Sequence, residues 1–86
     1  MLTTQQLGIL QHAIGADKYG RRGRGERNYF TTDANGADGR VCKSLVSLGL
    51  MKDRGSYGPI SGDGNIYVVT GQGIDAVTRE SPPAPK

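Results

Sequence analysis

The stretch that decides the fold runs from Val41 to Thr70 and reads VCKSLVSLGLMKDRGSYGPISGDGNIYVVT. Its first part has apolar residues at helical spacing and reaches Gly49, which predicts a helix ended by a glycine in a Schellman turn. A glycine-rich turn at residues 62–65 then separates two extended segments, which predicts a β-hairpin. The rest of the chain is placed around this order of helix, hairpin and a second helix.

The helix of this stretch is predicted to begin after Asn35 or Asp38, since both residue types are good N-caps. Cys42 falls among its apolar positions, so we expect a small buried core residue and not a nucleophile. The apolar side is expected to comprise Val41, Cys42, Leu45 and Leu48, with Leu50 packing back on Leu45. The opposite, exposed side is expected to comprise Arg40, Lys43, Ser44 and Ser47.

The segments that follow complete the predicted hairpin and a short last helix. Pro59 lacks a backbone N–H, which confines the first strand to an edge or a bulge. Thr70 is expected to cap a helix whose Ile74 and Val77 face inward, and the domain is predicted to end at residue 78. Residues 79–86 are rich in proline and are predicted to be a disordered tail.

The N-terminal third predicts a helix, a basic loop and a strand. Thr3 and Gln6 form the pattern of a capping box, and Gly15 supplies a stop, so residues 3–14 are predicted to be helical. Residues 16–27 combine three glycines with crowded like charges and are predicted to be a mobile loop. Residues 28–32 are aromatic and β-branched, which predicts a strand with Phe30 in the core. The fold class is therefore α+β, with a three-stranded antiparallel sheet packed against two helices.

Charge is the strongest functional signal. The 86-residue chain, one domain by length, has 11 Lys and Arg against 8 Asp and Glu, a net charge of +3. Residues 18–27 alone contribute +4, because they hold one acid, Glu26, against Lys18, Arg21, Arg22, Arg24 and Arg27. Such a local patch suits a polyanion, nucleic acid being the commonest, or an acidic protein surface.

Other classes of function find little support in the residues. One cysteine and one histidine cannot build a disulfide framework, a zinc site or a dyad, so neither an enzyme nor a cofactor is expected. The run Gly71-x-Gly73-x-x-Ala76 has the spacing of a dinucleotide fingerprint, but only 13 residues follow Gly73, too few for the second strand. No apolar run is long enough for a membrane span, and residues 1–5 lack a basic region followed by an apolar one, so neither a signal peptide nor a location outside the cytoplasm is expected.

Leu45, Leu48-Gly49-Leu50-Met51 and the run Tyr67-Val68-Val69-Thr70-x-x-Gly73, about residues 38–78 in all, resemble the C-terminal half of winged-helix DNA-binding domains of bacterial transcription regulators. In that family a leucine-x-x-x-Gly-Leu-Ile pattern precedes a wing hairpin and a Tyr-x-Leu-Thr-x-x-Gly run. The whole chain is also similar to small uncharacterised proteins of tailed phages and prophages, through the Leu2–Leu7 start, Arg27-Asn28-x-Phe30 and Gly49-Leu50-Met51. The chain departs from the winged helix at residues 16–36, where a loop and a strand stand in place of the middle helix.

Two functions are open on this basis. The first is a small phage-type nucleic-acid-binding or regulatory protein, with DNA or another nucleic acid as the partner. Its candidate contact residues are Lys18, Arg21, Arg22, Arg24, Arg27, Arg40, Lys43, Ser44, Ser47, Arg54 and Tyr57. The alternative is a protein-interaction module on a winged-helix-like scaffold, which inhibits or adapts a host complex through an acidic host surface and does not bind DNA.

Overall fold

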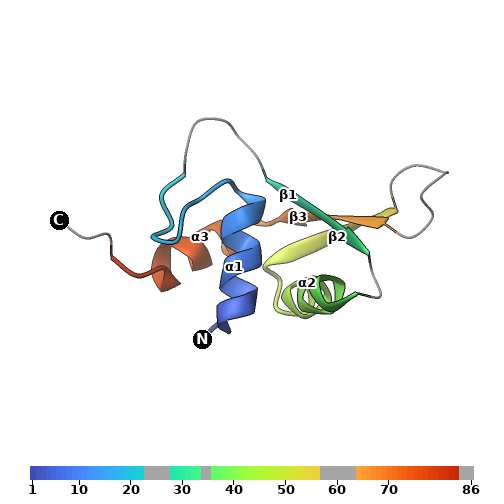
Figure 1. Ribbon diagram of the computed structural model, residues 1–86, viewed down its shortest axis with the longest axis horizontal. Helices are drawn as coiled ribbons and strands as arrows, with labels where there is room; N and C mark the ends of the chain where they lie inside the picture. Colours follow the sequence, from blue (N-terminus) through green and yellow to red (C-terminus); the bar gives the residue numbers. More distant parts are fainter. Residues whose placement is uncertain (23–27, 34–35, 57–63, 84–86) are drawn as a thin grey trace.

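A three-stranded antiparallel sheet and the helices packed against it make up the described part of the chain (Figure 1). The structure is a computed structural model that describes residues 1–22, 28–33, 36–56 and 64–83. In chain order its elements are α1 (Thr4–Ala13), β1 (Tyr29–Asp33), α2 (Ala37–Ser47), β2 (Met51–Ser56), β3 (Gly64–Val69) and α3 (Gly71–Glu80). The predicted α+β class and the predicted order of elements are confirmed.

β3 is the central strand of the sheet, in the order β1-β3-β2. Tyr29 pairs with Val68 on one side, and Met51 pairs with Val69 on the other. A bulge interrupts β2 between Asp53 and Ser56, where Gly55 has a φ of 87° and its N–H donates to Asp53 Oδ1 at 2.7 Å. The positive φ explains why a glycine stands there.

The predicted hairpin differs from the observed one in its limits. β2 begins at Met51, several residues before the predicted extended segment, because Met51 is only 2% exposed and anchors the strand start in the core. Gly64 and Asn65, predicted in the turn, belong to β3 and pair with Asp33 and Thr32. Residues 57–63, and with them Tyr57, Pro59 and the start of the predicted turn, lie outside the described residues.

α1 has the start that its sequence predicts. Gln6 N donates to Thr3 Oγ1 at 3.0 Å and Thr3 N donates to Gln6 Oε1 at 2.9 Å, so both halves of the capping box are present. After the helix Gly15 takes a φ of 70°, which is the left-handed conformation of a glycine stop.

The two ends of α2 are stabilised in different ways. Its N-cap is Gly36, which makes no side-chain hydrogen bond; Asp38 lies inside the first turn, and Asn35 is outside the described residues. Its end follows the prediction, since Gly49 has a φ of 78° and Leu50 N donates to Leu45 O at 2.9 Å. The expectation that Leu48 is buried is wrong: its side chain is 56% exposed, because it lies at the edge of a face centred on Cys42 and Leu45.

α3 is longer than predicted. Thr70 is the cap, as expected, with Thr70 Oγ1 accepting from Gly73 N at 3.1 Å. The helix continues to Glu80, so the disorder predicted from residue 79 is wrong at its start. Ser81 has extended backbone (φ −72°, ψ 143°) because it precedes Pro82, and this proline fixes where the helix stops. Residues 84–86 lie outside the described residues.

The core lies between the three helices and one face of the sheet, called here the inner sheet face. Leu10, Cys42, Leu45, Tyr67 and Val77 have no exposed surface, so each element except β1 and β2 contributes a fully buried side chain. Cys42 is buried, as predicted. Among the described residues, no helix is long and apolar enough to cross a membrane.

Candidate nucleic-acid interface

The exposed side of α2 carries two cations and a hydroxyl in register, at positions i, i+3 and i+7. We call Arg40, Lys43 and Ser47 the α2 polar face; all three side chains are exposed. They share one side of the helix because residues three and four apart are neighbours on its surface, and Cys42 and Leu45 are buried on the other side. Neither Arg40 nor Lys43 has an ion-pair partner among the described residues. Ser47 Oγ donates to Lys43 O at 3.3 Å, so both lone pairs of its oxygen remain able to accept hydrogen bonds.

Ser44, predicted on the same exposed face, is used inside the protein. Its hydroxyl donates to Val41 O at 2.6 Å and accepts from Gln6 Nε2 at 3.1 Å. The side chain therefore joins α2 to α1, and it is half-buried. The helical wheel placed Ser44 on the exposed side of α2 but could not show that α1 lies beside it.

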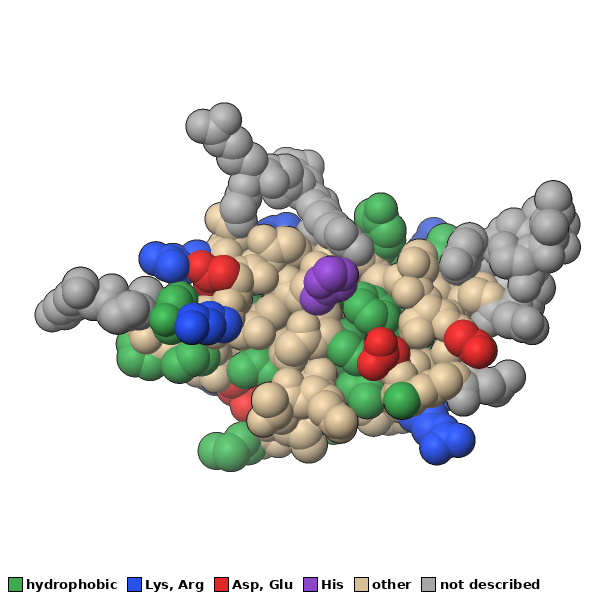
Figure 2. Space-filling model, in the orientation of Figure 1, with side chains coloured by type: hydrophobic (Ala, Val, Ile, Leu, Met, Phe, Trp, Pro, Cys, Tyr) green, Lys and Arg blue, Asp and Glu red, His purple; other side chains and the backbone are tan. Residues whose placement is uncertain are grey.

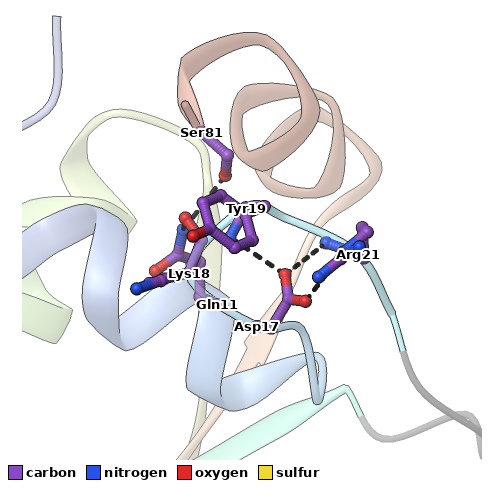
Figure 3. A network of polar contacts seen from close by, with 6 residues as sticks. All are labelled: Gln11, Asp17, Lys18, Tyr19, Arg21 and Ser81. Atoms are coloured by element: carbon purple, nitrogen blue, oxygen red, sulfur yellow. Dashed lines mark hydrogen bonds and ion pairs between the residues drawn. The ribbon is translucent and has the colours of Figure 1, made fainter. Parts of the chain in front are cut away.

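The first part of the predicted basic loop folds into an ordered turn, called here the basic turn (residues 17–22; Figure 3). Asp17 Oδ1 accepts from the backbone N–H groups of Tyr19 at 2.9 Å and Arg21 at 3.0 Å, and Asp17 Oδ2 accepts from Arg21 Nε at 2.9 Å. The hydrogen bond from the Arg21 backbone is the main cause that lowers the pKa of Asp17. One aspartate thus closes the turn and offsets part of its positive charge.

The basic turn is also fixed to the two helices beside it. Gln11 Nε2 donates to Lys18 O at 3.2 Å and to Ser81 Oγ at 3.0 Å, which ties α1, the turn and the end of α3 together (Figure 3). Gly20 has a φ of 79°, and a Cβ on it would come within 2.7 Å of Ser81 Oγ. A side chain at residue 20 would therefore push the turn away from α3.

Two cations of the turn lie near one aromatic ring. Lys18 Nζ is 5.1 Å and Arg21 Cζ is 5.2 Å from the centroid of the Tyr19 ring, within the range of cation–π attraction. Arg22 Nε donates to Ile14 O at 3.3 Å. The prediction of a mobile loop is wrong for residues 17–22, because Asp17 and Gln11 supply local partners. Arg24 and Arg27 lie outside the described residues.

The predicted contact residues do not gather on one surface. Figure 1 places the basic turn near α3, on the opposite side of α1 from α2. Figure 2 shows the same separation, with Lys and Arg side chains at one end of the molecule and again below α2. Arg54, predicted at the hairpin base, is exposed on β2. The α2 polar face and the basic turn are therefore separate basic surfaces.

One exposed cation of β2, Lys52, was absent from the predicted set. The residue before it, Met51, pairs with Val69, and both side chains are buried on one side of the sheet. Lys52 and its pairing partner Val68 are each one position along their strands, so their side chains point to the other side. The alternation Met51, Lys52 is visible in the sequence, but the extended segment was predicted to begin only after it.

A shallow groove of about 390 Å³ lies where the chain start meets the end of α3. Its lining includes Leu2, Leu7, Arg79 and Glu80, and Leu2 N donates to Glu80 Oε1 at 2.7 Å. No group of three or more possible metal-ligating side chains occurs among the residues that the structure describes. The groove thus brings together the guanidinium of Arg79, the carboxylate of Glu80 and apolar side chains.

Comparison with known protein families, with curated proteins and with solved structures found no match to this chain. The resemblance to winged-helix domains and to phage proteins therefore stays a prediction that rests on the residues quoted above.

Proposed function

We propose that the protein binds duplex nucleic acid, DNA in the first instance, as a winged-helix-like regulatory domain. One observation carries the proposal: the α2 polar face presents Arg40 and Lys43 to solvent without an ion-pair partner among the described residues. Cations that are not offset by nearby carboxylates can neutralise phosphates and release counterions, which is the main source of affinity for DNA.

The position of α2 in the fold supports this function. α2 is joined to β2 by a three-residue turn, so the helix and the edge of the hairpin are presented together. A helix is the element that enters a major groove most readily, while a neighbouring hairpin can contact the flanking backbone. Arg40 and Lys43 would then contact phosphates and base edges, and Ser47 would offer a hydroxyl one turn further along.

The basic turn has a secondary place in this proposal. Arg21 is ion-paired with Asp17 at 2.9 Å, so its contribution to binding a phosphate is reduced by a neighbouring negative charge. Lys18 keeps an exposed ammonium group near the Tyr19 ring. We expect the turn to add long-range attraction and not to set the register on DNA.

The test is a fluorescence anisotropy titration of a labelled random duplex at several salt concentrations. The double variant Arg40→Gln, Lys43→Gln should weaken binding and lower the log–log salt slope by about 1.8, since each phosphate contact contributes about 0.9. The variant Arg79→Gln removes an exposed cation of α3 and is the control. The proposal fails if the wild-type protein shows no binding at low salt, or if the double variant keeps the wild-type slope.

A protein-interaction function is the second candidate, and the exposed Leu48 favours it. This side chain is 56% exposed at the end of α2, close to Ser44 and the polar face, and a protein partner would bury it better than a DNA groove would. Under this alternative an acidic protein surface would pair with Arg40 and Lys43. The duplex titration separates the two: weak wild-type binding, unchanged in the double variant, would favour the protein partner.

A further inference from the structure

The side of the sheet that faces away from the helices is open in the described part of the chain. The sheet residues that pack with the helices in the core, Phe30, Met51, Tyr67 and Val69, all belong to the inner sheet face. Strand alternation places their neighbours on the other side, called here the outer sheet face. Its paired residues are Tyr29, Thr31, Asp33, Lys52, Ile66 and Val68, and Arg54 follows Asp53 at the bulge of β2.

The strand register arranges these residues in rows. Tyr29 on β1 pairs with Val68 on β3, and Val68 pairs with Lys52 on β2. Tyr29 and Lys52 are thus separated by two strand spacings, roughly 10 Å, with an aliphatic side chain between them. In the next row Thr31 pairs with Ile66. Arg54 enters the bulge of β2 beside this row.

The exposure of these side chains suits a ligand with aromatic groups and negative charge. The Tyr29 side chain is 49% exposed, and Ile66 and Val68 are half-buried between the two edge strands. Lys52 and Arg54 are exposed and have no ion-pair partner among the described residues. The neighbouring Asp53 lies on the side of Tyr67, its pairing partner, and its carboxylate accepts from Gly55 and Asn65. The acid of the outer sheet face, Asp33, pairs with Gly64 at the opposite end of β1 from Tyr29, on the far side of β3 from Lys52 and Arg54.

We propose that the outer sheet face binds single-stranded nucleic acid. A base stacks on the ring of Tyr29, the strand crosses the aliphatic surface of Val68 and Ile66, and its phosphates reach Lys52 and Arg54. Only an unpaired base has a face free for stacking on a side chain, which is why this surface selects a single strand. The site goes beyond the duplex function proposed above and is independent of it, because the α2 polar face points away from the sheet on the opposite side of the molecule.

An acidic polypeptide is a different occupant with a different requirement. It would use Lys52 and Arg54 but would gain little from the tyrosine ring, since carboxylate side chains do not stack. The presence of an exposed aromatic ring in the same row as Lys52 therefore favours the nucleic acid. The contribution of Tyr29 is what an experiment must measure.

The test uses the full chain and a labelled oligothymidylate of about 12 nucleotides, a length within the range covered by one small domain. Tyr29→Leu keeps an apolar side chain on β1 and removes the ring, and should weaken binding roughly 5- to 150-fold. Tyr29→Phe keeps the ring and should bind within about twofold of the wild type, since stacking needs the ring face alone. Lys52→Gln and Arg54→Gln should each lower the log–log salt slope by about 0.7.

Two further measurements keep the result independent of folding defects and of the duplex function. In an amide chemical-shift titration, residues 29, 31, 52, 54 and 68 should respond to the oligonucleotide, which requires no variant. The control Arg79→Gln removes a cation elsewhere and should keep the binding of the single strand. Duplex binding is measured in parallel, and Tyr29→Leu should leave it unchanged whether or not the α2 proposal holds.

The proposal is overturned by any of three results. The first is an absence of single-strand binding at low salt in the folded wild-type protein. The second is equal binding by Tyr29→Leu and the wild type. The third is displacement of the oligonucleotide by polyglutamate at an equal concentration of charge, which would assign the surface to an acidic polypeptide.

Discussion

Gly73 lies where α3 approaches the segment between α2 and β2 most closely. A Cβ at this residue would overlap the backbone carbonyl of Leu50 and come within 2.6 Å of Val69 Cγ1. Both neighbours are held by the sheet and the core and cannot move away freely. In the sequence the glycines after Val69 have the spacing of a dinucleotide fingerprint without the segments that should follow it. In the structure Gly73 permits close packing, and its N–H donates to the cap residue Thr70.

A substitution at Gly73 should therefore be costly, while one at Gly71 should not. Gly73→Ala is expected to lower the free energy of unfolding by about 1 to 3 kcal/mol through overpacking. Gly71→Ala is the matched control, because a Cβ there has no neighbour within 4 Å and alanine is the better helix former. Urea unfolding followed by circular dichroism gives both values. Equal stability of the two variants would show that the approach of α3 to Leu50 is looser than described.

The two threonine caps differ in how much of the fold each one holds together. Thr3 makes a local capping box at the exposed start of α1. Thr70 Oγ1 accepts from Gly73 N at 3.1 Å and also donates to Gly49 O at 2.7 Å, so it links the start of α3 to the end of α2. Thr70 is half-buried, and water replaces these partners less easily there.

Removal of the two caps should expose this difference. Thr3→Ala is expected to cost about 0.5 to 1 kcal/mol of unfolding free energy, and Thr70→Ala about 1.5 to 2 kcal/mol. Thr70→Ser keeps the hydroxyl and should recover most of the loss. Chemical denaturation of the three variants measures the order. If Thr3→Ala were the more damaging variant, the Thr70–Gly49 hydrogen bond would contribute little to stability.

The elements that were predicted well are those whose signals are local. The capping box at Thr3, the glycine stops at residues 15 and 49 and the cap at Thr70 each depend on residues a few positions apart. The errors arose where a distant segment decides the outcome. Ser44 is engaged by Gln6 from α1, the basic turn is fixed by Gln11 and Ser81, and β2 starts early because Met51 enters the core. The contacts of Gln6 and Ser81 leave no pattern within one segment, whereas the alternation of Met51 and Lys52 is local and visible in the sequence.

For the candidate site, the sequence predicted which side of α2 is exposed but not how the basic segments are distributed over the whole molecule. Charge counting along the chain treats residues 16–27 as one patch, whereas the folded turn places Asp17 against Arg21 at 2.9 Å. The α2 polar face and the outer sheet face lie on opposite sides of the same core. A molecule this small can thus present the α2 polar face, the basic turn and the outer sheet face without bringing them together.

The core that separates these surfaces contains a thiol, and its ionisation should make the stability of the whole molecule depend on alkaline pH. Burial, with a smaller effect of the Asp38 carboxylate, raises the pKa of Cys42 from 9.0 to about 11. Between these two values the unfolded chain loses the proton and the folded chain keeps it. The unfolded state is then favoured as the pH rises, so the stability associated with the neutral thiol is complete below pH 9 and is lost between pH 9 and about pH 11.

By pH 10 the wild-type protein should have lost about 1.4 kcal/mol of unfolding free energy relative to pH 8 through this residue. Burial also raises the pKa of Tyr67 from its ordinary value of 10.0, so ionisation of this tyrosine in the unfolded chain adds to the loss as the pH approaches 10. The variant Cys42→Ala keeps Tyr67 and therefore separates the two effects. Cys42→Ala removes the titrating group; it should be less stable at pH 8 because of the cavity, but its stability should change little up to pH 10. Urea titrations of both proteins at pH 8, 9 and 10 measure the two slopes, and parallel slopes would mean that Cys42 ionises as readily in the folded chain as in the unfolded one.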